Sequence, residues 1–140
     1  MACLSNLHQI GLGLELYIQD NNHRLPFCAQ LPTLNSNLTP ITTALAPYLQ
    51  APRVYLCPAD TTYFKVEKTS YEWNNFLNGA SYDHPEEWSP ATQTIVDTIF
   101  GGRLNTPLVG DAAAYHPKEG TRTGKNALYF EGRVQSAKTR

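Results

Sequence analysis

The strongest hydrophobic pattern in the chain lies at its start, between Cys3 and Asp20. At about 100° per residue, seven apolar or small positions of this segment fall within one arc of roughly 140°. They are Leu4, Leu7, Ile10, Gly11, Leu14, Tyr17 and Ile18. The pattern predicts a helix that lies on a core. The polar run "QDNNH" predicts its end, because these residues tolerate turns, and Leu25 before Pro26 favours extended backbone.

A second, narrower apolar strip lies on the far side of the same helix. Leu12 and Leu16 project there, beside Ser5 and Gln9. Two interpretations stand side by side: a loop folds over these leucines, or another helix or subunit packs on them. Glycines at positions 11 and 13 each cost the helix up to ~1 kcal/mol relative to alanine, so they indicate support from packing or from close approach of another backbone.

Turn-forming residues predominate over residues 27–40, which predicts a path along the surface. The next stretch, "TPITTALAPYLQAP", predicts a short helix or a pair of helical turns. Thr39 can cap it with Pro40 at its first position, and Pro47 shortens or kinks it. Its apolar spacing is helical, with Ile41, Leu45 and Leu49 on one side.

The remaining chain is dominated by short β-prone runs separated by turns. Three runs predict strands of a small antiparallel sheet: residues 54–58, 63–66 and 70–73. Residues 74–90 are polar and turn-rich, which predicts a long loop. A further strand is expected at "PLVGD", residues 107–111, followed by a loop over residues 112–123.

The C-terminal stretch "NALYFEGRVQS" has the pattern of a β-hairpin. Two β-prone runs flank Glu131 and Gly132, which predicts a two-residue hairpin turn at these positions. Glu131 tolerates a positive φ less well than Asn or Asp does. We therefore expect a small strain here or a different turn type.

Composition describes an ordinary globular protein. The 140 residues predict one domain spanning 1–140, and the 41% hydrophobic and 16% charged fractions exclude the composition of a disordered chain. Eleven Lys and Arg are balanced by twelve Asp and Glu, so no nucleic-acid partner is predicted. No apolar run approaches the ~20 residues that span a bilayer.

The three cysteines, Cys3, Cys28 and Cys57, lie too far apart for a CxxC motif. Their odd number fits either a reducing compartment or one disulfide with a spare thiol, and both stay open at this point. Cys57 and His116, with Asp111 or Asp60, provide the residue types of a Cys–His–Asp hydrolase. No local motif supports that set, so a hydrolase is a remote alternative.

No cofactor or metal is predicted. The four histidines, at positions 8, 23, 84 and 116, lack metal-ligand spacing, which favours surface or structural roles. Asp111 ends a predicted strand beside a loop and is a candidate cation ligand, but the calcium-binding EF-hand spacing is absent.

Four aromatic residues are candidates for ligand stacking if their loops expose them: Trp73, Tyr82, Trp88 and Tyr115. They make a glycan-, peptide- or partner-binding module the alternative function. A core role is the commoner one for such residues.

Several segments, in this order, resemble the type IV pilin-like and type II secretion pseudopilin-like proteins. They are "CLSNLHQIGLGLELYIQDNNHRLP", "LAPYL", "YLCPAD", "SYEWN", "VGD" and "GKNALYFEGRVQ". The more specific resemblance is to the bacterial prepilin group with a C-terminal H-x9-D-G processing-associated motif. That motif is degenerate here, since Thr121, Glu131 and Arg133 stand where the group has His, Asp and His.

The resemblance implies an α+β pilin-like fold, in which a long N-terminal helix packs on a small antiparallel sheet with long loops. Residues 1–20 would be the C-terminal half of the long helix, and residues 21–140 the sheet and loop region. A short leader and a hydrophobic helix of ~20 residues would precede them, with Met1 marking a truncation. The resemblance also implies a disulfide between Cys3 and Cys57, with Cys28 as the unpaired cysteine.

The implied function is a non-enzymatic structural subunit of a type II secretion pseudopilus or a type IV pilus-like assembly. Its precursor would be anchored in the inner membrane, with the soluble domain periplasmic or extracellular. The implied partners are other pilin-like subunits, contacted through the N-terminal helix, and components of the secretion machinery. Leu12 and Leu16 would then belong to an assembly surface.

Overall fold

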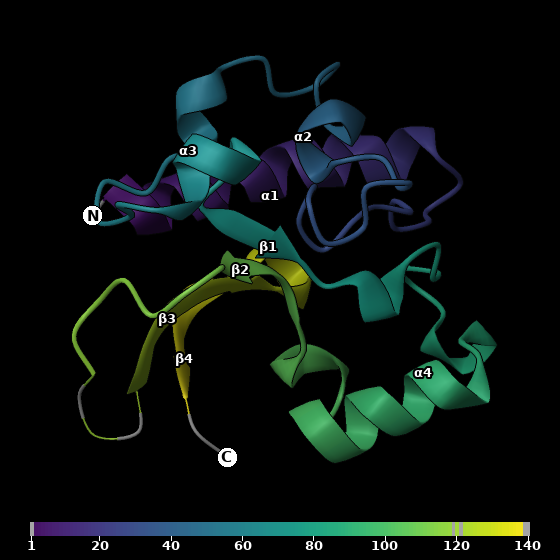
Figure 1. Cartoon of the computed structure of the whole chain (residues 1–140). Helices are drawn as coiled ribbons and strands as arrows, with labels where there is room; N and C mark the ends of the chain where they lie inside the picture. The colour runs from purple at the N-terminus through teal and green to yellow at the C-terminus, as the bar shows by residue number, and fades with distance from the viewer. Residues whose placement is uncertain (1, 119, 121, 139–140) are drawn as a thin grey trace.

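The computed structural model describes residues 2–118, 120 and 122–138. Met1 and Thr121, which the resemblance singled out, lie outside these residues. The chain has an α+β fold, with an N-terminal helix α1 (Ala2–Asp20) next to a four-stranded antiparallel sheet (Figure 1). The sheet has the order β1-β2-β3-β4. Its strands are β1 (Tyr71–Trp73), β2 (Pro107–Asp111), β3 (Arg122–Tyr129) and β4 (Val134–Lys138).

Short helices fill the connections between these elements. They are α2 (Ile41–Ala44), α3 (Tyr63–Glu67) and α4 (Pro90–Ile95), which continues into a π-helical segment at Val96–Phe100. Further 3-10 turns lie at Pro52–Tyr55, Asn75–Leu77, Pro85–Glu87, Arg103–Asn105 and Phe130–Gly132. The helix α4 was not predicted from the sequence.

Helix α1 confirms the predicted stripe, which packs on β3, β4 and the turn at Pro52–Tyr55. A Cβ at Gly11 would lie 3.1 Å from Leu128 of β3, and one at Gly13 would lie 3.3 Å from Leu49. Both glycines therefore gain support from packing, on two different sides of the helix. The buried residues of α1 are Cys3, Leu7, Ile10, Gly13, Leu14 and Ile18.

The predicted end of α1 is also confirmed. Asn22 and His23 both have a φ of 58°, and the His23 amide donates to the Ile18 carbonyl at 2.9 Å. On the outer side, the exposed fractions of Leu12 and Leu16 are 63% and 47%. The interpretation in which a loop covers these leucines is therefore wrong for the described part of the chain.

Two of the predicted strands are wrong. Residues 63–66 lie in helix α3, because Asp60 caps it: its carboxylate accepts hydrogen bonds from the amides of Thr62, Tyr63 and Phe64 at 2.8–2.9 Å. Residues 54–58 begin inside the 3-10 turn Pro52–Tyr55, where Pro52 stands at the start. At α2 the predicted Thr39 cap is wrong, since Pro40 is the N-cap and makes no side-chain capping bond.

The predicted strands at residues 70–73 and 107–111 are confirmed as β1 and β2, and the C-terminal hairpin as β3 with β4. The hairpin connection differs from the prediction. Leu128 pairs with Val134, and the Tyr129 amide donates to the Arg133 carbonyl at 2.7 Å. The connection is therefore three residues long, and its first residue, Phe130, is buried in the core.

Glu131 has a φ of 68° and Gly132 a φ of 77°. The expected strain at Glu131 is therefore present, in a left-handed conformation that a non-glycine residue adopts at a cost of about 1 kcal/mol. Arg103 contacts its carboxylate at 3.2 Å.

Candidate functional site around the Cys3–Cys57 disulfide

A disulfide joins the first turn of α1 to the segment that follows the Pro52–Tyr55 turn. The Cα atoms of Cys3 and Cys57 are 5.1 Å apart, and both residues are buried. The pairing that the resemblance implied is confirmed. Cys28 is the free cysteine, and burial raises the pKa of its thiol to about 11, so it is protonated at neutral pH.

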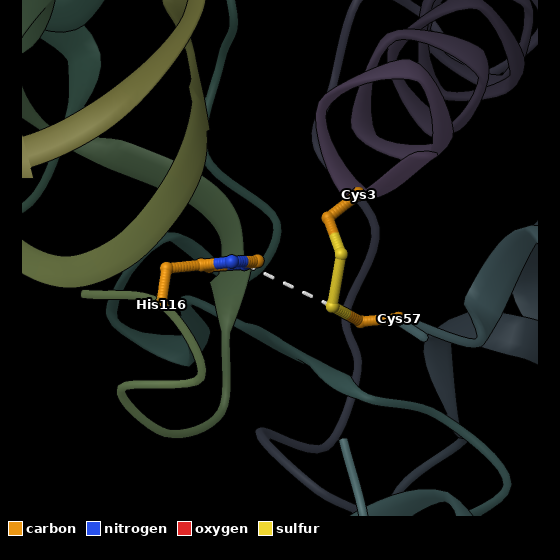
Figure 2. Close-up of side chains that lie close together, drawn as sticks. All are labelled: Cys3, Cys57 and His116. Atoms are coloured by element: carbon orange, nitrogen blue, oxygen red, sulfur yellow. Dashed lines mark hydrogen bonds between the residues drawn. A yellow bond between two sulfur atoms is a disulfide. The ribbon is translucent and has the colours of Figure 1, made fainter. Parts of the chain in front are cut away.

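His116 lies against this disulfide. Its Nε2 is 3.8 Å from Cys57 Sγ and 3.2 Å from Asp111 Oδ2. Figure 2 shows the imidazole pointing at the Cys57 sulfur from the opposite side to α1. About a quarter of the His116 side chain, 26%, is exposed, so it is the part of the cluster that solvent reaches.

The loop that carries His116 is fixed to β3 at Gly124. The His116 amide donates to the Gly124 carbonyl at 3.0 Å, and Gly124 has a φ of 82° within an irregular part of the strand. A Cβ at this position would lie 2.5 Å from the His116 carbonyl oxygen. Only glycine combines this conformation with this close approach.

Asp111 ends β2 and is buried beneath His116. Its Oδ2 accepts the Asn126 amide at 2.8 Å, whereas its Oδ1 is buried with no hydrogen-bond partner among the described residues. Burial raises the pKa of the Asp111 carboxyl to about 6, against the lowering effects of the Asn126 amide and of His116.

The structure brings Cys57, His116 and Asp111 together, but not as a hydrolase triad. Both Cys57 and Asp111 face the same imidazole nitrogen, Nε2, whereas a triad places the carboxylate on the opposite nitrogen. Cys57 is also held in the disulfide and offers no thiolate. Asp60, the other candidate, caps α3 and accepts the Ser70 hydroxyl at 2.6 Å.

Ser70 is a residue that sequence reasoning missed. Its hydroxyl accepts the Cys57 amide at 2.9 Å, and its carbonyl accepts the Tyr115 hydroxyl at 2.9 Å. It therefore links the cysteine to the loop that carries His116. A serine just before a three-residue strand carries no sequence signal for this role.

The four candidate aromatic residues are not exposed in the way that a binding module would require. Trp73 lies in β1 and is fully buried, and Trp88 is buried too. Their indole N–H groups donate at 2.7 Å to Asn78 Oδ1 and to the Ser81 carbonyl, respectively. The premise that both tryptophans are exposed in loops is wrong, because both serve the core. Tyr82 packs on Phe130 and is only partly exposed, as is Tyr115.

Two other histidines make surface contacts. His23 lies 3.0 Å from Asp83, and His84 lies 3.2 Å from Glu86, with all four side chains largely exposed. His8 is exposed on α1. The sequence predicted surface or structural roles for the histidines, and His116 contacts a buried carboxylate and the disulfide.

Comparisons with protein families, curated proteins and solved structures find no match to this chain. Among the described residues, none of the helices has the length and apolar character needed to cross a membrane.

Asp111 predicts a pH dependence of stability. Its folded pKa of about 6 exceeds the usual value of about 3.9, so ionisation costs folding free energy that begins to appear near pH 4 and is fully present by about pH 7. Relative to Asp111→Asn, the wild-type chain should lose about 2 kcal/mol of stability as the pH rises from 4 to 7. Urea unfolding at each pH measures this difference.

Asp60→Asn is the matched control. Burial raises the pKa of Asp60, but hydrogen bonds from Ser70 and from three amides outweigh it and lower the pKa overall. Its stabilising effect is therefore already complete above about pH 5, and its difference from wild type should stay flat from there to pH 7. A flat difference for Asp111→Asn as well would contradict the assignment.

Proposed function

We propose that this chain is the soluble domain of a pilin-like structural subunit, acting in a type II secretion pseudopilus or a type IV pilus-like assembly. The observation that carries the proposal is the outer face of α1. Leu12 and Leu16 are one helical turn apart and largely exposed, although the opposite face of α1 is buried in the core. An exposed apolar pair on an otherwise well-packed helix fits a surface that another subunit covers.

The helix-on-sheet arrangement supports the same function. α1 lies across β3 and β4 of an antiparallel sheet, which is the arrangement that the resemblance implies. Gly11 lets Leu128 of the sheet approach the helix closely.

The disulfide favours a location outside the cytoplasm, since buried structural disulfides persist in oxidising compartments. The disulfide therefore supports a domain in the periplasm or outside the cell. The proposed anchor, a hydrophobic helix upstream of Ala2, follows from the resemblance to the pilin-like proteins. The gene sequence immediately upstream tests this placement. A basic leader followed by ~20 apolar residues is expected, and an upstream reading frame without them would overturn it.

The assembly surface is tested by replacing both leucines with lysine in the full-length protein. Leu12→Lys with Leu16→Lys should reduce association between two differently tagged copies at least about tenfold, because a charged pair cannot be buried between subunits. Cross-linking in the native host, followed by co-purification, measures this association.

A second double variant, Val66→Lys with Leu104→Lys, serves as the control. These residues are 66% and 54% exposed and lie outside α1, so association should persist. Both double variants should leave the unfolding free energy of the soluble domain within about 0.5 kcal/mol per position. Equal association of the α1 variant and the control would contradict the proposed surface.

A further inference from the structure

Four side chains with metal-binding chemistry converge at the disulfide. The ligand atoms of Cys3, Cys57 and His116 all lie within 4.8 Å of one another, and Asp111 Oδ2 is 3.2 Å from the His116 imidazole. We infer that reduction of the Cys3–Cys57 disulfide converts this cluster into a binding site for a thiophilic divalent cation of the Zn²⁺ class. This inference is independent of the proposed assembly function.

The geometry is close to what such an ion needs. Zn²⁺ binds thiolate sulfur at about 2.3 Å and imidazole nitrogen at about 2.0 Å, so tetrahedral ligand atoms stand roughly 3.5–3.8 Å apart. Cys57 Sγ and His116 Nε2 are already 3.8 Å apart. The two sulfurs separate when their bond is reduced, and the three ligand atoms, which lie within 4.8 Å of one another, then need only a small adjustment around the ion.

The environment of the Asp111 carboxylate is a second observation that points to a cation. A buried carboxylate oxygen without a hydrogen-bond partner is costly, and Asp111 Oδ1 is such an atom among the described residues. A cation beside Nε2 would lie next to this carboxylate and attract it, and because two thiolates already balance a dication, the loaded site keeps one net negative charge. Asp111 thus lies beside the site, next to the His116 nitrogen, whereas the three ligand atoms within 4.8 Å of one another are those of Cys3, Cys57 and His116.

Most of the site is fixed before any ion arrives. The Cys57 amide is bonded to Ser70, the His116 amide to Gly124, and Asp111 to the Asn126 amide. Cys3 comes from α1, outside these hydrogen bonds, and adjusts when the sulfurs separate. The exposed edge of His116 provides access for the ion.

The chemistry balances with a dithiol as reductant. Two thiol groups of the reductant become a disulfide, and the two electrons with two protons convert the Cys3–Cys57 bond into two thiols. The dication then displaces both thiol protons to solvent and takes the Nε2 lone pair, while the imidazole proton resides on Nδ1. Two thiolates neutralise the charge of the ion.

Cobalt(II) is the probe for this site. The folded protein is first reduced with a trialkylphosphine. The phosphine is oxidised to a phosphine oxide with oxygen from water, and both sulfurs become thiols. The reduced protein is then titrated with Co²⁺. Reduced protein should bind one equivalent with thiolate-to-metal charge-transfer absorption and the visible bands of a tetrahedral ion. Zn²⁺ should displace the Co²⁺, and the oxidised protein should show neither feature.

Variants distinguish Co²⁺ binding at this cluster from binding at other side chains of the protein. His116→Gln should weaken Co²⁺ binding at least about tenfold, and Asp111→Asn should weaken it measurably. Cys28→Ala and His23→Gln should bind like wild type, since the first residue is a buried thiol outside the cluster and the second is paired with Asp83.

Two results would overturn the inference: reduced protein without a tetrahedral Co²⁺ spectrum, or His116→Gln binding as tightly as wild type. Near-UV circular dichroism monitors the fold during reduction. If reduction alone unfolds the chain, one equivalent of Zn²⁺ should restore the native spectrum, and a failure to restore it would count against the site.

Discussion

Replacing both Cys3 and Cys57 by alanine is expected to lower the free energy of unfolding by about 4 kcal/mol. The bond joins positions 54 residues apart, and the chain-entropy model assigns about 4 kcal/mol to a closed loop of this size. Both sulfurs are also buried where α1 meets the rest of the core, so their packing is lost as well. Urea and thermal unfolding measure the effect, with a fall in Tm of roughly 10 °C.

Cys28→Ala is the control for this prediction. It removes a buried sulfur but closes no loop, so its cost should be limited to packing, about 1 kcal/mol. Wild-type protein in the presence of reductant and a metal chelator should resemble the double variant. Unfolding curves of the double variant and of Cys28→Ala that coincide would show that the disulfide does not stabilise the fold in this way.

The helical periodicity of α1 was predictable because a long amphipathic segment shows its buried face directly in the sequence. Leu7, Ile10 and Leu14 repeat at helical spacing, and all three are buried. The turn after α1 was predictable too, since Asn22 and His23 adopt the left-handed conformations that such residues tolerate.

The shorter elements depended on contacts that the local pattern does not contain. Residues 63–66 have β-prone side chains, but the three amides bonded to the Asp60 carboxylate start a helix there. Similarly, the hairpin connection is one residue longer than predicted, and its first residue, Phe130, is buried in the core.

The candidate site was only partly predictable. Its residues, Cys57, His116 and Asp111, were recognised as chemically relevant, but their geometry depends on Gly124 and on the pairing of β2 with β3. The sequence could not show that one imidazole nitrogen faces both the sulfur and the carboxylate. That detail separates a hydrolase triad from the arrangement in the structure.

Trp73→Ala is expected to destabilise the fold by about 3–5 kcal/mol, the usual cost of truncating a buried aromatic residue. Trp73 lies in β1 with none of its surface exposed, and its indole nitrogen donates to Asn78 Oδ1 at 2.7 Å. Asn78 Oδ1 also accepts the Cys28 amide, so the indole is one part of a hydrogen-bonded cluster that links β1 to the chain at Cys28. Urea unfolding monitored by circular dichroism measures the loss.

Phe76→Ala provides the comparison, because this aromatic residue is three positions along the chain and 50% exposed. Its replacement should change stability by no more than about 0.5 kcal/mol. Trp73→Phe keeps most of the apolar volume, so it should stay folded with a smaller loss of unfolding free energy. It can therefore be compared with Phe76→Ala even if Trp73→Ala does not fold. Equal stabilities for Trp73→Ala and Phe76→Ala would contradict the core role and return Trp73 to the candidates for ligand stacking.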